Sequence, residues 1–208
     1  MHVVFDMDGV LLDSESDLSW LDRALDETLR SFDIEPTPER RHLLYPTNLR
    51  RFESAAAELD LPVETLWERR QEHYVREKQR AIQTGQIGPF EDVAVLEELA
   101  GTGPVSIISN SPESIVETFI EVAQLEPFLD QYIGRGAAMS AIEEMKPART
   151  FYDRLDERTA ETEYVYVGDG QTDALFAQRT GMEFIHLDRE NGEVGDLRSV
   201  KDRIDALL

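Results

Sequence analysis

Two aspartates stand two residues apart directly after the apolar run at the start of the chain. Asp6 and Asp8 follow residues 3–5, and Gly9 comes next. Side chains alternate along a strand, so both carboxylates project to the same side if the strand continues through them. Near a protein surface, two such charges about 4 Å apart repel by roughly 4 kcal/mol. The pair therefore needs a cation or a proton close by, unless the segment is an ordinary acidic Asp-Gly turn.

Polar side chains also follow later apolar segments. They are Ser109 and Asn110 after residues 104–108, Lys146 in a later loop, and Asp169 and Asp173 after residues 164–167. Ligands of open α/β sheets bind outside the carboxyl ends of the strands, so we expect these side chains to converge with the first two aspartates. Oxygen ligands at this density suit a hard cation such as Mg²⁺. A metal and a lysine together would then bind an anion, most naturally a phosphoryl group.

Several of these residues also have an ordinary structural interpretation. Ser109 and Asn110 could form only a turn before a helix, and Lys146 could be a surface lysine. Asp173 could merely offset the dipole of a helix, although its spacing from Asp169 favours a functional role. The histidines are too scattered along the chain to predict a metal cluster; they are His2, His42, His73 and His186.

The elements that must position these residues follow an alternating pattern. Apolar runs typical of strands occur at residues 3–5, 104–110, 131–134, 164–167 and 184–187. Helical patterns separate the later runs, at about 90–100, from 113, at 148–156, at 171–180 and at 196–208. Strands that alternate with helices predict an α/β core with a doubly wound, mainly parallel sheet.

Residues 14–88 interrupt this pattern with helices alone. We expect helices at about 18–32, from Thr37-Pro38 onward, at 49–59 and at 63–84, with glycines at 85 and 88 ending the last one. The predicted division is therefore a core formed by residues 1–13 and 89–208, and an all-helical insertion formed by 14–88. The connections at 10–14 and 85–89 are the predicted hinges.

Composition limits the classes of function. The 208 residues include 43 acidic and 21 basic side chains, a net charge of −22 that argues against nucleic-acid and anionic-membrane partners. Cysteine is absent, which excludes disulfides and thiolate chemistry. We find no membrane-length apolar run and no basic, apolar leader, and we expect a cytoplasmic protein. The lysine-poor, acid-rich surface resembles proteins adapted to high salt, with an ordinary acidic protein as the alternative.

Taken together, the motifs resemble those of the haloacid dehalogenase-like (HAD) superfamily. The four motifs of that family occur in order and span the whole chain: Asp6-Met7-Asp8-Gly9, Ser109-Asn110, Lys146-Pro147, and Gly168-Asp169 through Asp173. The insertion at 14–88 resembles the helical cap of one large subgroup. The resemblance implies a HAD-like Rossmannoid core and a Mg²⁺-dependent phosphatase acting on a small phosphorylated metabolite, such as a sugar phosphate or phosphoglycolate.

The same resemblance implies roles for individual residues. Asp6 would attack phosphorus, and Asp8 would serve as general acid and then general base. The expected metal ligands are Asp6, Asp169 and the backbone carbonyl of Asp8, with Asp173 as a ligand or just behind them. The expected phosphoryl-binding residues are Ser109, Asn110 and Lys146.

Alternatives within and beyond this family remain open at this stage. Relatives that cleave carbon–halogen or phosphonate bonds lack the second aspartate, and the latter use a cap lysine; Lys78 is the single lysine of the insertion. Phosphosugar mutases carry a histidine where this chain has Leu18, and a non-catalytic binding protein is expected to lose Asp6 or Asp8. The sequence does not choose between a monomer and a homodimer.

The insertion is less acidic than the rest of the chain. It holds 11 basic and 15 acidic residues, a net charge of −4, against −18 for the remainder. We therefore expect it to close over a negatively charged substrate. Its arginine pairs, at positions 40–41 and 50–51, are candidates for substrate contact, but a solvated face is the better expectation for any single one.

Overall fold

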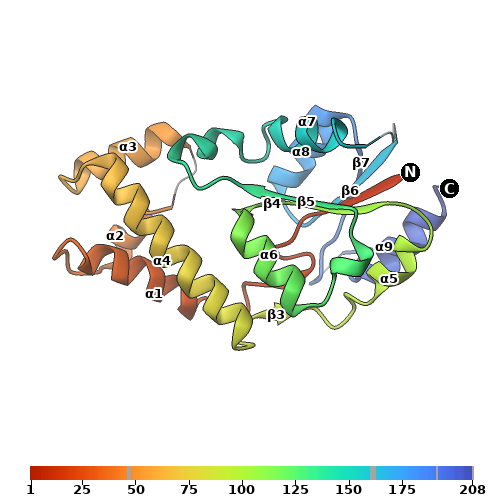
Figure 1. Cartoon of the computed structure of the whole chain (residues 1–208), viewed down its shortest axis with the longest axis horizontal. Coiled ribbons are helices and arrows are strands. Elements are labelled where there is room, and N and C mark those ends of the chain that lie inside the picture. Colours follow the sequence, from red (N-terminus) through yellow and green to blue (C-terminus); the bar gives the residue numbers. More distant parts are fainter. Residues whose placement is uncertain (46–47, 160–162, 191, 208) are drawn as a thin grey trace.

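The computed structural model describes residues 1–45, 48–159, 163–190 and 192–207. Its centre is a sheet of five strands in the order β5-β4-β1-β6-β7, and every neighbouring pair is parallel (Figure 1). The strands are β1 (His2–Phe5), β4 (Val105–Pro112), β5 (Gln131–Arg135), β6 (Tyr164–Gly168) and β7 (Glu183–His186). The predicted doubly wound parallel α/β core is confirmed.

Helices cover both faces of this sheet. On one face lie α5 (Val95–Ala100), α6 (Glu113–Val122) and α9 (Leu197–Asp205); on the other lie α7 (Thr150–Asp156) and α8 (Gln171–Thr180) (Figure 1). Alternate residues of β1 supply the two cores: Val3 and Phe5 pack in the cluster that contains α5, α6 and α9, and Val4 packs in the one that contains α7 and α8. Burial on both faces explains why the central strands β1 and β6 are apolar along most of their length.

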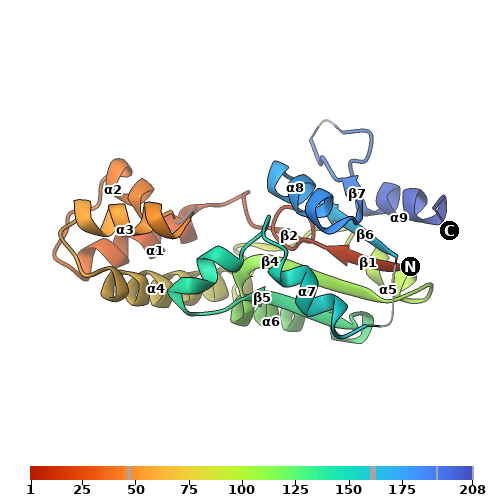
Figure 2. The ribbon, with the colours of Figure 1, turned by 90° about the horizontal axis from the view of Figure 1, so that it is seen from above.

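Four helices between the first and second strands of the main sheet stand apart from it. They are α1 (Ser19–Arg30), α2 (Pro38–Leu43), α3 (Leu49–Glu58) and α4 (Val63–Gln83), and Figure 2 shows them grouped beyond one end of the sheet. Thr37 caps α2 and Pro38 occupies its first turn, as the sequence predicted. No helix within the described ranges, not even the 21-residue α4, is long and apolar enough to cross a membrane.

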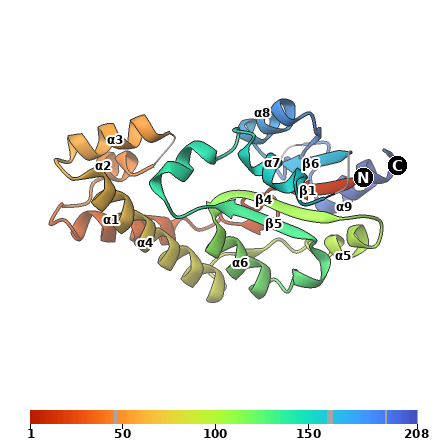
Figure 3. The same cartoon turned by 45° about the horizontal axis from the view of Figure 1, so that its top comes forward.

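The longest of these helices also reaches back to the core. Gln79 of α4 donates hydrogen bonds to the Ser114 carbonyl at 3.0 Å and to Thr118 Oγ1 at 2.9 Å, so α4 lies against α6 (Figure 3). Apolar residues of α1, α3 and α4 belong to the same buried cluster as those of α5, α6 and α9. The helical group is therefore packed against the core in this structure.

Three details correct the sequence-based expectations. Two short antiparallel strands, β2 (Leu12–Asp13) and β3 (Gly88–Pro89), occupy the predicted hinges, because two-residue strands carry no periodicity. The helix expected at 90–100 begins only at Val95, after a turn. The 3₁₀ helices η1 (Glu126–Phe128) and η2 (Met139–Glu144) were not predicted. The division between residues 13 and 14 and between 88 and 89 passes through the β2–β3 pair and stays a prediction.

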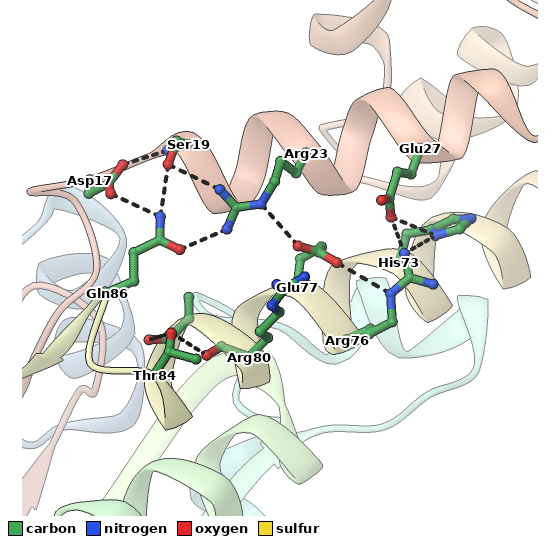
Figure 4. Close-up of polar contacts among 11 residues, drawn as sticks. Asp17, Ser19, Arg23, Glu27, His73, Arg76, Glu77, Arg80, Thr84 and Gln86 are labelled. Atoms are coloured by element: carbon green, nitrogen blue, oxygen red, sulfur yellow. Dashed lines mark hydrogen bonds and ion pairs between the residues drawn. The ribbon is translucent and has the colours of Figure 1, made fainter.

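A chain of polar contacts ties the two connections to the helices (Figure 4). Gln86 donates to Asp17 Oδ2 at 2.9 Å and to Ser19 Oγ at 2.8 Å, and it accepts from Arg23 at 2.7 Å. Arg23 Nε in turn donates to Glu77 Oε2 at 3.1 Å. The start of α1, the end of α4 and the residues that lead into β3 are thereby held together.

Candidate active site

The predicted site residues gather at the carboxyl edge of the parallel sheet. Asp6 follows β1, Asp169 follows β6, and Asp173 lies in the first turn of α8. Ser109 and Asn110 lie in the second half of β4, which continues through them rather than turning. Lys146 comes from the loop after η2, so residues far apart in sequence meet because all five strands run the same way.

Lys146 forms the centre of the first cluster. Its Nζ lies 2.9 Å from Asp6 Oδ1, 2.6 Å from Asp173 Oδ1 and 2.7 Å from the hydroxyl of Tyr166. The Tyr166 hydroxyl donates to the same Asp173 oxygen at 3.0 Å. The side chains of Lys146 and Asp173 are 2% and 5% exposed, so this is a buried ion-pair network and not a surface contact.

The carboxylates of this cluster exceed its single ammonium group. Burial raises the pKa of Asp6 to about 7. The charge of Lys146 opposes this shift, and the charge of Asp173 adds to it. Burial and Asp173 likewise raise the pKa of Asp169 to about 6. When all three carboxylates are ionised, they exceed the one lysine by two negative charges, and a divalent cation would balance them.

Carboxylate oxygens of Asp6, Asp169 and Asp173 lie within 4.8 Å of one another, a spacing that fits a metal ion. Glycine at position 9 leaves room for this arrangement, because a Cβ there would lie 1.9 Å from Asp169 Oδ2. The φ of Gly9, +78°, also favours glycine. Asp173 already accepts from Lys146 and from the Gly170 amide, so Asp6 and Asp169 keep the freer oxygens. An all-oxygen set of this kind suits Mg²⁺.

Asp8 lies in a different environment, two residues from Asp6. Lys78 Nζ of α4 donates to its Oδ1 at 2.5 Å, and Ser111 Oγ donates to its Oδ2 at 2.8 Å. Burial would raise the pKa of Asp8, but the charge and hydrogen bond of Lys78 and the bond from Ser111 together lower it. The repulsion between the two aspartates is therefore offset by two separate lysines.

The two predicted phosphoryl-binding residues of β4 make contacts of their own. The Asn110 side chain accepts from the Lys146 amide at 2.7 Å and donates to the Lys146 carbonyl at 3.4 Å, which fixes the backbone that carries the lysine. Ser109 Oγ accepts from the Ser111 amide at 3.0 Å and is almost fully buried. Their roles toward a phosphoryl group stay predictions.

Sequence reasoning missed three residues of the site. Ser111 and Tyr166 carried no distinctive signal, since a serine after a strand and a tyrosine within one are common. Lys78 had a signal that was not used: the chain has only three lysines, Lys78, Lys146 and Lys201, and two of them are buried here.

A cavity of about 330 Å³ lies between the helical group and the sheet, and Asp8, Lys78 and Asn110 line it. The arginines at positions 40–41 and 50–51 are not among the residues that line it. Arg41 instead pairs with Asp26, from Nε to Oδ1, at 2.5 Å. The arginines that reach the cavity are Arg70 and Arg135.

Comparison with known proteins places this geometry in a family. Residues 3–187 match the family model described as haloacid dehalogenase-like hydrolase. No curated protein matched the sequence.

Solved structures share the fold over nearly their whole length. A candidate beta-phosphoglucomutase from Thermotoga maritima has a TM-score of 0.64 at 17% identity, covering 100% of this chain and 99% of that one. CbbY from Rhodobacter sphaeroides, in complex with phosphate, has 0.65 at 19%, covering 94% and 91%. The candidate HAD hydrolase YfnB from Bacillus subtilis, bound to magnesium, has 0.67 at 15%, covering 98% of each chain.

Proposed function

Because this chain belongs to the haloacid dehalogenase-like hydrolase family, we propose that it is a Mg²⁺-dependent phosphatase that hydrolyses a small phosphorylated metabolite. One observation carries the proposal. Asp6 is buried against Lys146 beside two further carboxylates, while Asp8 faces the cavity under the helical group. The residues proposed as nucleophile, acid–base group and cation ligands thus lie at one edge of the sheet.

Asp6 is the proposed nucleophile. Its carboxylate attacks phosphorus, an aspartyl-phosphate forms, and the bond from phosphorus to the substrate alcohol breaks. Lys146, 2.9 Å from Asp6 Oδ1, holds the carboxylate in place. The Met7 amide also donates to Oδ1, at 2.7 Å, so the carboxylate is fixed in one orientation before the substrate arrives.

Asp6, Asp169 and the backbone carbonyl of Asp8 are the proposed ligands of Mg²⁺, with Asp173 behind them. Mg²⁺, when bound, supplies charge stabilisation for the phosphoryl oxygens. Asp173 holds Lys146 in place through its Oδ1, 2.6 Å away.

Asp8 is the proposed acid–base group. In the first half of the reaction it gives a proton to the departing alcohol, and in the second it takes one from the water that attacks the phosphoryl group. Its contacts with Lys78 and Ser111 favour the ionised form, which is the form that the second half requires. The first half requires the protonated form, so Asp8 would have to take up a proton as the substrate binds and the Lys78–Asp8 contact changes.

Residues 14–88 are the proposed cap and residues 1–13 with 89–208 the proposed core. Lys78 belongs to the proposed cap and Asp8 to the proposed core. The position of the cap therefore affects the contacts of the proposed acid–base group. The β2–β3 pair is the proposed hinge. The magnesium-bound structure of YfnB reveals interdomain movement, which supports the same behaviour here.

A phosphate-release screen tests the proposal. The purified protein is assayed with Mg²⁺, and then with a chelator, on sugar phosphates, phosphoglycolate and an aryl phosphate. Asp6→Asn, which removes the nucleophile, should reduce release to the level without enzyme. A folded wild-type protein that releases no phosphate from any substrate would contradict the hydrolase proposal, and activity that survives Asp6→Asn would contradict the covalent step.

A phosphosugar mutase with the same covalent step is the second candidate. The whole-chain similarity to the candidate beta-phosphoglucomutase favours it, while Leu18, which lines the cavity, supplies no acid–base group. Nuclear magnetic resonance of the products separates the two: a mutase converts one sugar phosphate isomer to another, and a phosphatase yields free sugar and phosphate.

A further inference from the structure

Two buried arginines reach the cavity from different parts of the chain. Arg70 lies on α4 and Arg135 ends β5, and they are 5% and 3% exposed. Both line the 330 Å³ cavity that also holds Asp8. We call Arg70 and Arg135 the arginine pair. Lysine and arginine side chains are almost never buried without a partner, so their partners decide what the pair does.

Arg70 has neutral partners. Its Nε donates to the Leu44 carbonyl at 3.0 Å, and this is the one hydrogen bond of its guanidinium to the described residues. The group stacks over the ring of Tyr74, 4.6 Å from the ring centre. Its two terminal nitrogens are therefore available to a ligand in the cavity.

Arg135 also has neutral partners. Its terminal nitrogens donate to Gln71 Oε1 at 2.9 Å and to the Gly136 carbonyl at 3.0 Å. Its guanidinium stacks over the ring of Trp67, at 5.0 Å. Burial and then the charge of Arg70 lower the pKa of Arg135 to about 10. The two cations thus repel each other, and a guanidinium group stays charged near pH 7.

Within the described ranges, no carboxylate lies within 4.0 Å of either member of the arginine pair. The chain has 43 acidic residues for 21 basic ones, so acidic partners were abundant. Among the other charged groups on the cavity, Asp8 is paired with Lys78, and Glu15 is exposed. The cavity therefore keeps an excess of positive charge beside the proposed acid–base group.

We propose that the arginine pair binds a second anionic group of the substrate. The proposal rests on the proposed function and narrows it: the substrate is a small phosphate ester that also carries a carboxylate or a second phosphate. One anionic group lies at Asp6 and Lys146, and the other at Arg70 and Arg135. Two charged guanidinium groups recognise either anion through charge-assisted hydrogen bonds, and the cavity volume restricts the substrate to a small molecule.

Binding to the Asp6→Asn protein, with Mg²⁺ present, tests this without turnover. The probes are two matched pairs. Glycerol 3-phosphate and 3-phosphoglycerate differ by a carboxylate, and glucose 6-phosphate and glucose 1,6-bisphosphate differ by a phosphate. Calorimetry should give a dissociation constant about 10- to 100-fold lower for the more anionic member of at least one pair, the range that one or two charge-assisted hydrogen bonds supply. The pair that shows the difference identifies the second anion.

The ratio of the two dissociation constants within a probe pair measures this preference. Arg70→Met and Arg135→Met, each in the Asp6→Asn background, should reduce the ratio to about 2 or less. The matched control is Arg69→Met, which removes an exposed arginine of the same helix that pairs with Glu72 and leaves the ratio unchanged. Arg70→Lys, which keeps the charge, provides a second variant if the methionine variants fail to fold.

The outcomes separate this inference from the proposed function. A ratio near 1 for both pairs in the Asp6→Asn protein overturns the inference, whatever the variants do. A ratio that persists without either arginine shows that the arginines have a structural role only, and also overturns it. Selective anion binding by a wild-type protein that releases no phosphate would support the arginine pair and contradict the hydrolase.

Discussion

Lys146→Met removes the cation at the centre of the site and gives the sharpest test of its energetics. The Lys146 side chain is 2% exposed, and its Nζ has three polar partners within 3 Å: Asp6, Asp173 and Tyr166. Methionine fills a similar volume, so the change is mainly one of charge. Breaking a buried ion pair by removing one partner costs about 3–5 kcal/mol, and here two carboxylates lose the same lysine.

The cost has a pH dependence that can be measured. The pKa of Asp6 is already raised from 3.8 to about 7 with the lysine present, and loss of the lysine raises it further. A carboxyl group whose pKa is raised by folding binds its proton more tightly in the native state, so its contribution to stability falls as pH rises above 3.8. The loss in free energy of unfolding caused by Lys146→Met should therefore be larger at pH 8 than at pH 5.

Urea unfolding of the metal-free protein, followed by circular dichroism, measures this deficit. Lys201→Met is the matched control, because Lys201 forms an i,i+4 pair with the 43%-exposed side chain of Asp205 and should change the free energy of unfolding by about 0.5 kcal/mol or less. If Lys146→Met unfolds within about 1 kcal/mol of the wild type at pH 8, or if its deficit shrinks as pH rises, the electrostatic reasoning for this cluster is wrong.

Three further predictions concern neighbouring parts of the structure. Lys78→Met leaves Asp8 without its cation and should lower kcat by about 100-fold with little change in KM, measured in steady state on the best substrate. Gly9→Ala places a Cβ 1.9 Å from an Asp169 oxygen and should weaken Mg²⁺ binding measured by calorimetry. Glu77→Gln should cost about 1–2 kcal/mol at pH 7, because two arginines donate to this 3%-exposed carboxylate. Those arginines outweigh burial and hold the pKa of Glu77 below 4.5, so the cost disappears as pH falls through the native pKa.

Each of these predictions has a control and a contradicting result. Lys201→Met is also the control for Lys78→Met. An unchanged kcat in Lys78→Met would show that Lys78 has no part in the mechanism. Gly85→Ala introduces alanine at a comparable φ of +71° with no atom within 4 Å, and equal loss of Mg²⁺ affinity in both would show that backbone strain is the cause. Glu72→Gln alters an exposed pair on the same helix, and a Glu77→Gln deficit that grew in acid would invert the argument.

The fold could be predicted wherever the hydrophobic pattern extended over many residues. Strand β6, with five buried residues, and α4, with 21 residues and a glycine at its end, lie within one or two residues of their expected positions. The two-residue strands β2 and β3 could not be predicted, because pairing between residues 12–13 and 88–89 depends on how the helical insertion returns to the core. The helix expected at 90–100 is present as α5, but residues 91–94 form a turn, so only its start was wrong.

The candidate site, too, could be predicted only in part. Asp6, Lys146, Asp169 and Asp173 were predicted to converge because parallel strands bring their carboxyl ends to one edge, and the structure places them in contact or within 4.8 Å. The partner of Asp8 was not predicted. It is 70 residues away on a helix outside the sheet, and no strand pattern connects the two.

The environments of Asp6 and Asp8 shift their pKa values in opposite directions. Burial raises the pKa of Asp6, and Asp173, the second buried carboxylate at Lys146, adds to the shift; a cation bound at the site would favour the ionised, nucleophilic form of Asp6. Asp8 has a lysine of its own and a serine, so its pKa is lowered without any metal. A nucleophile needs its ionised form and a general acid its protonated form. The proposed roles therefore require a cation beside Asp6 and a change in the contact between Lys78 and Asp8. The Lys78 contribution depends on how the helical insertion sits on the core, so movement of that insertion would change the proton affinity of Asp8 and leave Lys146 beside Asp6.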